Sequence, residues 1–325
     1  MTKWLSLDEV KKFEIELSSH CNARCPLCIR QELGTDKERN DHNKGHLIFE
    51  QIKSLVDQLP DPTNVVFYFG GIGGDPMMNP EIVEIFDYCS KNLKSVTMDT
   101  NASLRSQEVW RQLGEISFKY GSSINFSIDG LEDTNHIYRI RTDWHKIVKN
   151  ATSFIKAGGY ATWKYIVFKH NQHQVKEAEE LSKKLGFREF TYENSVRHYK
   201  DVGPLQPDPP DNVEKKKIKT YASQVQAKEI NCKALEKKML YISNDFHLYP
   251  CCYFHAWYSF EKNTVENYMN MNNNLNERSL FDIINDEFFK NKLVHDWNKL
   301  QPNVCAKTCN QIQYWNRNIE KITNE

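Results

Sequence analysis

The chain of 325 residues carries 43 basic and 43 acidic side chains and is 39% hydrophobic, which suits a globular protein of one large domain or two unequal ones. Its zero formal net charge gives no electrostatic signature of nucleic-acid binding, and no apolar run approaches the roughly 18 residues of a membrane span, so we expect neither partner. The N-terminus lacks the apolar core of a signal peptide, which favours a cytoplasmic protein with reduced thiols.

Strand and helix patterns alternate through the first part of the chain. Six alternating or apolar runs predict strands at 13–17, 65–69, 95–100, 123–128, 162–168 and 188–193. Amphipathic helical patterns lie between them at 47–59, 80–92, 106–116, 144–159 and 173–186. These β/α units predict an α/β fold in which a parallel sheet curls into a partial (β/α)6 barrel.

Unusual segments follow four successive strands of this predicted barrel. A cysteine-rich loop follows the first strand, FGGIGGDP (69–76) ends the second, TNAS (100–103) ends the third and SIDG (127–130) ends the fourth. In such sheets the C-terminal ends of the strands carry the binding and catalytic groups. We therefore expect one functional site at this end of the barrel.

The first loop contains three cysteines, Cys21, Cys25 and Cys28, within eight residues. An odd number of thiols in a reducing compartment favours metal or redox chemistry over disulfides. Cys89, in contrast, falls on an apolar stripe at helical spacing and is expected to be a core residue.

The spacing Cys21-x3-Cys25-x2-Cys28, together with Gly71-x2-Gly74-Asp75-Pro76 after the second strand, resembles the radical S-adenosylmethionine (SAM) superfamily. The resemblance implies a [4Fe–4S] cluster bound by three thiolates, with a fourth iron that chelates S-adenosylmethionine. One-electron cleavage then gives a 5′-deoxyadenosyl radical that abstracts hydrogen from substrate. The alternative for the three cysteines is a structural zinc site, with His20 as a possible fourth ligand.

The same resemblance implies further contacts to S-adenosylmethionine. Most family members have Gly-Gly-Glu-Pro where this chain has Gly73-Gly74-Asp75-Pro76, so the shorter carboxylate is a departure. Arg139 suits the cofactor carboxylate because a guanidinium offers paired donors. The alternative for these segments is ordinary turns at strand ends. The expected cofactor-binding residues are Gly73, Gly74, Asp75, Thr100, Asn101, Ser127, Asp129 and Arg139.

A proline-rich and charged stretch suggests a linker over residues 201–231, which separates a barrel at 1–200 from a small domain at 232–325. The segment from Cys232 to Cys252 resembles the start of the SPASM/twitch extension of radical SAM enzymes, with YISNDFHLYP (241–250) as its hairpin. Phe246 stands where the family usually has glycine. If Cys251 lies on a strand, Cys252 points the other way.

The resemblance implies a twitch-like domain with a single auxiliary iron–sulfur cluster, expected to be of the [4Fe–4S] type, which would relay an electron. Its expected ligands are Cys232, Cys251, Cys305 and Cys309, and a Cys₄ zinc site is the alternative.

The expected function is that of a radical SAM oxidoreductase or maturase acting on a peptide or small molecule, reduced by a flavodoxin or ferredoxin. The first strand begins near residue 12, so we expect no separate leader-binding domain before it. No catalytic acid or base is identified. Two other functions remain open: a zinc-stabilised binding module and a non-catalytic iron–sulfur electron carrier.

Overall fold

The computed structural model of the chain describes residues 3–32, 34–40, 43–194, 230–260, 272–300, 302–309 and 320–323. The barrel strands are β1 (Lys12–Ile15), β2 (Val66–Phe69), β3 (Ser95–Thr100), β4 (Ser123–Ser127), β5 (Tyr160–Val167) and β6 (Glu189–Asn194). Between them lie α1 (Phe49–Asp57), α2 (Ile82–Asn92), α3 (Gln107–Tyr120), α4 (Asn135–Tyr138), α5 (Trp144–Lys156) and α6 (Val175–Leu185).

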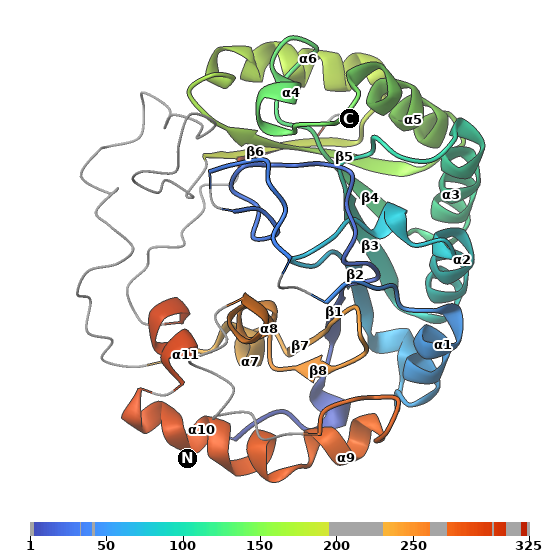
Figure 1. Cartoon of the computed structure of the whole chain (residues 1–325). Coiled ribbons are helices and arrows are strands. Elements are labelled where there is room, and N and C mark those ends of the chain that lie inside the picture. Colours follow the sequence, from blue (N-terminus) through green and yellow to red (C-terminus); the bar gives the residue numbers. More distant parts are fainter. Residues whose placement is uncertain are drawn as a thin grey trace.

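Each neighbouring pair from β1 to β6 is parallel. Figure 1 shows the sheet curving like an open barrel, with the long helices of this region on its convex side. The predicted α/β fold with a partial (β/α)6 barrel is therefore confirmed.

The outer face of the strands is apolar and packs against the helices. Burial alternates along β3, where Val96 and Met98 are fully buried, and along β2, where Phe67 and Phe69 are. A period of two in strands and of 3.6 in helices gives each element one apolar side, and these sides form the core. Cys89 of α2 is completely buried in this core, as its position predicts.

Local signals explain where the helices begin and end. The Ser106 side chain accepts a hydrogen bond from Val109 N at the start of α3, and the Asp143 side chain does the same with Lys146 N at the start of α5. Gly121 ends α3 in the left-handed conformation (φ 76°). The starts of α3 and α5 and the end of α3 therefore follow from capping residues that the sequence displays.

The C-terminal part of the chain extends the barrel sheet at both edges. Strand β7 (Met239–Ile242) pairs parallel with β1, and β8 (Leu248–Tyr249) pairs antiparallel with β7. At the other edge β9 (Glu320–Thr323) pairs antiparallel with β6. The order among the described strands is β8-β7-β1-β2-β3-β4-β5-β6-β9. The predicted hairpin is confirmed, and it continues the barrel sheet.

Phe246 in the hairpin turn adopts a φ of +63°. This left-handed conformation explains why related turns favour glycine at the position, because a Cβ is strained there. The Phe246 side chain is 1% exposed, so its apolar burial offsets the backbone strain.

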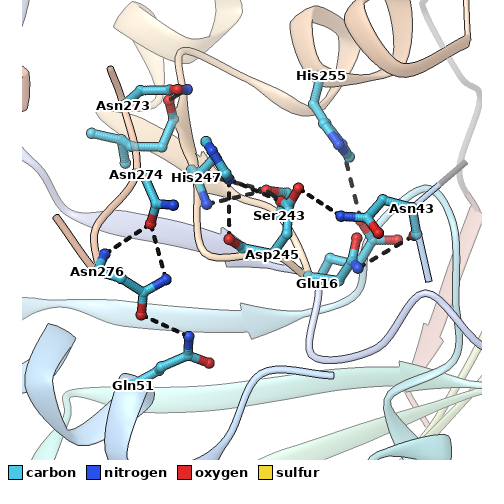
Figure 2. Close-up of polar contacts among 12 residues, drawn as sticks. Glu16, Asn43, Gln51, Ser243, Asp245, His247, His255, Asn273, Asn274 and Asn276 are labelled. Atoms are coloured by element: carbon cyan, nitrogen blue, oxygen red, sulfur yellow. Dashed lines mark hydrogen bonds and ion pairs between the residues drawn. The ribbon is translucent and has the colours of Figure 1, made fainter. Parts of the chain in front are cut away.

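Polar contacts hold the hairpin and the segment after it against the barrel (Figure 2). Asn43 Nδ2 donates to Asp245 Oδ2 at 3.1 Å. Gln51 Nε2 of α1 donates to Asn276 Oδ1 at 2.9 Å. Residues about 200 positions apart in sequence are thus in direct contact.

The remaining C-terminal helices are short: α7 (Lys233–Glu236), α8 (Cys252–Phe260), α9 (Leu280–Ile284), α10 (Leu293–Asp296) and α11 (Asn303–Thr308). Of the predicted linker 201–231, residues 201–229 lie outside the described residues, so the domain boundaries stay a prediction. Among the described helices, none combines the length and apolar character required to cross a membrane.

Candidate functional site

The three cysteines of the first loop gather at the carboxyl end of the barrel strands. Cys25 is buried in a small cluster with Tyr138 and Phe168, and Cys21 and Cys28 pack against the same cluster. The Cys28 N–H donates to the Cys25 carbonyl at 2.9 Å, which makes a tight turn between these two thiols. The loop therefore directs all three cysteines toward one region.

Donors and cations surround these thiols. Arg139 Nη1 lies 4.0 Å from Cys25 Sγ, and Asn101 Nδ2 lies 3.6 Å from Cys21 Sγ. Burial raises the pKa of Cys25 to about 11, and the charge of Arg139 opposes this rise. Burial raises the pKa of Cys21 as well. Because metal ligation requires thiolates, binding of a cluster here would release protons.

The glycine-rich loop after β2 packs directly on the segment that leads to Cys21. The Asp75 N–H donates to the His20 carbonyl at 2.8 Å. A Cβ added at Gly74 would lie 1.7 Å from the Ser18 carbonyl oxygen. Glycine is therefore needed at position 74 because two backbone segments approach closely there. This requirement goes beyond that of an ordinary turn at the end of a strand.

Replacing Gly74 by alanine should destabilise the fold, since a backbone segment and not a flexible side chain blocks the new methyl group. We expect a loss of about 2–3 kcal/mol in the free energy of unfolding, as for overpacked cores. Gly45→Ala is the matched control, because its Cβ would meet Asn244 Nδ2 at an ordinary 3.5 Å. Urea denaturation of both variants measures the difference, and equal midpoints would contradict the packing role of Gly74.

Asp75 is the centre of a buried hydrogen-bond network between the loops after β2 and β3. Its carboxylate accepts from Met77 N (3.0 Å), Thr100 Oγ1 (2.9 Å), Asn101 N (2.8 Å) and Asn101 Nδ2 (2.7 Å). Burial raises the pKa of Asp75, and these hydrogen bonds oppose the rise. The Asp75 carboxylate is thus hydrogen-bonded to the loop after β3. Asn101 of that loop also approaches Cys21 and so links Asp75 to the cysteine loop.

Asp129 and Arg139 form a buried ion pair beside the cysteine loop. Arg139 Nε donates to Asp129 Oδ2 at 2.6 Å, and Ile166 N donates to Asp129 Oδ1 at 2.7 Å. Asp129 is completely buried, whereas the Arg139 side chain is 17% exposed. Asp129 therefore orients Arg139, and the remaining Arg139 donors lie toward Cys25. Ser127 ends β4 and is partly exposed.

Four of the C-terminal cysteines interact electrostatically with one another. Burial raises the pKa of Cys251 first of all, and the nearby Cys305, Cys232 and Cys309 thiols add to it. Burial also raises the pKa of Cys305, with further contributions from Cys232 and Cys309. Cys309 N donates to the Cys305 carbonyl at 2.8 Å. The structure thus brings together the four cysteines that the sequence analysis grouped.

Cys252 differs from these four in its surroundings. Burial raises its pKa first of all, and the nearby Glu14 carboxylate of β1 adds to the rise. The expectation that Cys251 lies on a strand is wrong, because β8 ends at Tyr249 and α8 begins at Cys252. Strand alternation therefore does not explain the different surroundings of the two thiols.

Glu16 is a site residue that the sequence analysis missed. Its side chain is 1% exposed and accepts from Gly73 N (2.6 Å) and from the Tyr241 hydroxyl (2.9 Å). Burial raises its pKa to about 7. His255 of α8 approaches it at 3.9 Å (Figure 2). Glu16 therefore connects β1, the glycine-rich loop and the C-terminal segment. The alternation in FEIEL (13–17) shows on which strand face Glu16 lies. The sequence pattern does not reveal that β7 lies beside Glu16.

Arg30 was also missed. It is 2% exposed, and its guanidinium donates to the carbonyls of Cys21 and Ala23 at 3.4 Å and to Glu38 Oε1 at 2.7 Å. Burial opposes ionisation of Glu38, but Arg30 together with Lys44 and Arg24 outweighs it and lowers the Glu38 pKa to about 2. Arg30 therefore fixes the backbone of the cysteine loop.

In the part of the chain that the structure describes, no three histidine, cysteine or acidic side chains converge closely enough to enclose a single metal ion. An iron–sulfur cluster makes a different demand, since each thiolate binds a separate iron. Three thiols beside N–H donors and an arginine fit this group, because such donors stabilise the sulfur ligands. The donor set at Cys21, Cys25 and Cys28 is thus suited to a cluster.

Residues 15–192 match the Radical SAM superfamily. This span covers more than half of the chain and includes the cysteine loop and the strands β2 to β5. The chain belongs to the Radical SAM superfamily. The expectation of a radical SAM enzyme is confirmed at this level, and with it a [4Fe–4S] cluster and S-adenosylmethionine as the cofactors of the family.

Several curated relatives are similar to this radical SAM chain. The tungsten-containing aldehyde ferredoxin oxidoreductase cofactor-modifying protein of Pyrococcus furiosus is 27% identical over 128 residues, 39% of this chain and 33% of the relative. The subtilosin biosynthesis protein AlbA of Bacillus subtilis is 26% identical over 179 residues, 54% of this chain and 38% of AlbA. The mycofactocin maturase MftC of Mycobacterium tuberculosis is 25% identical over 174 residues, 53% and 41% of the two chains. Each match spans less than half of the relative's length.

Solved structures share the fold. SuiB of Streptococcus suis bound to S-adenosylmethionine superposes with a TM-score of 0.57 at 14% identity, over 91% of this chain and 71% of SuiB. The structure of anSMEcpe with bound AdoMet gives 0.55 at 15% identity, over 89% and 83%. At these identities the likeness concerns the fold of the radical SAM chain.

Proposed function

We propose that this chain cleaves S-adenosylmethionine reductively at the barrel site and uses the product to abstract hydrogen from a substrate. The observation that carries the proposal is the gathering of Cys21, Cys25 and Cys28 beside Arg139 and Asn101 at the ends of the barrel strands. When bound, the cluster and S-adenosylmethionine together supply a 5′-deoxyadenosyl radical.

The chain's own residues hold and orient these groups. Cys21, Cys25 and Cys28 are the cluster ligands. The backbone of Gly73 and Gly74 receives the cofactor amino group, and Glu16 keeps that backbone in place through its hydrogen bond to Gly73 N.

The free donors of Arg139 bind the cofactor carboxylate, while its ion pair with Asp129 fixes the guanidinium. Ser127 at the end of β4 contacts the ribose. Asp75, Thr100 and Asn101 act mainly on one another, so their contribution is to position the loops and the Cys21 thiol.

The C-terminal segment belongs to the proposal as a twitch-like domain at 232–325, after a linker at 201–231. Cys232, Cys251, Cys305 and Cys309 would bind an auxiliary [4Fe–4S] cluster that relays an electron. Support comes from backbone hydrogen bonds that join Asn231, the neighbour of Cys232, to Cys309 at 2.7 Å and Cys309 to Cys305 at 2.8 Å. The influence of these thiols on the pKa of Cys251 and the hairpin that precedes Cys251 agree with this grouping.

The substrate proposed is a peptide or a small molecule. Relatives are named for subtilosin biosynthesis and mycofactocin maturation, and one SuiB structure contains the precursor peptide SuiA. A flavodoxin or ferredoxin would supply electrons. A cytoplasmic location stays part of this proposal and rests on the number of cysteines that are not paired in disulfides.

Metal analysis separates this proposal from the two alternatives. After anaerobic reconstitution we expect about eight irons and eight sulfides per chain, as two [4Fe–4S] clusters require. Tightly bound zinc without sulfide would support the zinc-stabilised binding module instead. Iron and sulfide without any binding of S-adenosylmethionine would support the electron carrier.

A further inference from the structure

The inner face of the barrel carries a continuous polar network. Five adjacent strands contribute one side chain each, and we call these the lumen network: Lys12, Tyr68, Asp99, Asn125 and Lys164. Asp99 Oδ2 accepts from the Tyr68 hydroxyl at 2.6 Å, and Asp99 Oδ1 accepts from Asn125 Nδ2 at 2.5 Å. Lys164 Nζ donates to both Asp99 oxygens, at 3.2 and 2.9 Å.

This composition differs from that of a packed barrel interior. In closed (β/α)8 barrels, layers of branched apolar side chains fill the interior. Here Lys164 lies on β5 and reaches Asp99 on β3 across Asn125 on β4, so all three share the concave face. The Lys164 side chain is 39% exposed and that of Asp99 is 23% exposed, so solvent reaches the pair. The lumen network is therefore an accessible polar surface.

Counting donors and acceptors identifies the group that can bind there. The Asp99 carboxylate already accepts from Tyr68, Asn125 and Lys164, which leaves it little capacity for a ligand. Two of the three Lys164 protons suffice for Asp99, so the ammonium keeps a donor for another acceptor.

Lys12 adds a second positive charge nearby. Lys12 Nζ lies 4.6 Å and Lys164 Nζ 5.9 Å from the centre of the Tyr68 ring. Glu14 offsets the charge of Lys12 as Asp99 offsets that of Lys164, but the Lys164 side chain is 39% exposed and keeps a donor for another group. Lys164 is thus the better donor to an incoming anionic group.

The position of Lys164 relates it to the cysteine loop. Ile166, two residues further along β5, lies on the same strand face and packs against the cluster that contains Cys25. Two residues of a strand span about 7 Å. Lys164 therefore lies one side-chain layer below the cysteine site. A substrate that approaches the cysteine site from the lumen would pass Lys164.

We propose that the lumen network recognises a carboxylate of the substrate, with Lys164 as the donor and Asp99, Tyr68 and Asn125 as the residues that hold Lys164 in place. This inference rests on the proposed function, because it treats the lumen as the substrate site. A free carboxylic acid and a glutamate or aspartate side chain of a peptide present the same group.

Ligand-observed NMR on the anaerobically reconstituted full chain tests this proposal without S-adenosylmethionine or reductant. The probes are glutarate against glutaramide, and acetylated, amidated Gly-Glu-Gly against the corresponding Gly-Gln-Gly. We expect at least one carboxylate to bind about ten-fold more tightly than its amide, equivalent to about 1.4 kcal/mol. Preference within the first pair indicates a small acid, and preference within the second pair alone indicates a peptide.

Two variants assign the preference to Lys164. Lys164→Met should abolish it, whereas Lys183→Met on α6, whose side chain is 49% exposed, should retain it. Because Lys164→Met leaves Asp99 without its cation, the double variant Asp99→Asn/Lys164→Met serves as a second test, with circular dichroism as a check of folding. The double variant should also lose the preference.

Equal binding of acid and amide by the wild-type chain, or an unchanged preference in both Lys164 variants, would overturn the proposal. These results are independent of cofactor cleavage. A chain that fails to cleave S-adenosylmethionine but keeps the carboxylate preference would refute the proposed function alone.

Discussion

Replacement of Cys21, Cys25 and Cys28 together by alanine is expected to remove about four irons per reconstituted chain, the content of one [4Fe–4S] cluster. The three thiols lie at one small group of buried apolar side chains. Arg139 and Asn101 direct donors toward Cys25 and Cys21. Without the thiolates the site retains cationic and N–H donors, which do not bind iron. Iron and sulfide analysis of the variant measures the loss.

Cys89→Ala is the matched control for this variant. Cys89 is fully buried in α2 and lies in the apolar core, so its replacement should lower stability without loss of iron. Retention of all iron in the triple variant would contradict the ligand assignment. Loss of iron in Cys89→Ala while the chain remains folded would contradict it as well.

Cys251→Ala is expected to remove the second set of about four irons, whereas Cys252→Ala should keep them. These neighbours differ in their surroundings, because the Cys305, Cys232 and Cys309 thiols add to the raised pKa of Cys251, whereas the Glu14 carboxylate adds to that of Cys252. Cys251→Ala should also stop substrate turnover but permit uncoupled cleavage of S-adenosylmethionine at the barrel site. Mössbauer spectroscopy on the two variants distinguishes the two clusters.

The reverse pattern, with iron lost in Cys252→Ala and kept in Cys251→Ala, would overturn the choice of ligands. Equal retention in both variants together with bound zinc would exclude the auxiliary cluster. The reversed iron loss would show that Cys252 and not Cys251 binds the cluster. Bound zinc would show that the site holds a different metal.

The barrel was predictable because its signals are local. Each strand has a period of two and each helix a period of 3.6, and Ser106, the first residue of a predicted helix, caps α3. The predicted end of that helix at residue 116 falls short of Tyr120, because Gly121 was not used as its stop signal. The site followed from the same pattern, since parallel strands bring their carboxyl ends together. Strand order brings the loops that carry the cysteines and Asn101 to the same end of the sheet, whereas the choice of Asn101 and Arg139 came from the family resemblance.

The features that were missed depend on contacts between distant parts of the chain. Glu16 and Tyr241 are 225 residues apart, and Glu16 contacts Tyr241 because β7 pairs with β1. The role of Asp75 was also unpredictable, because its partners are set by the approach of the β3 loop. For Cys252 the argument from strand alternation fails, because α8 begins at this residue.

Formation of 5′-deoxyadenosine tests the central claim most directly. The anaerobically reconstituted wild-type chain, incubated with S-adenosylmethionine and dithionite, should form 5′-deoxyadenosine and methionine in equal amounts, and chromatography coupled to mass spectrometry quantifies both. The Cys21, Cys25 and Cys28 triple variant should form neither. Absence of both products from a wild-type chain that holds its full complement of iron and sulfide would contradict the proposed function.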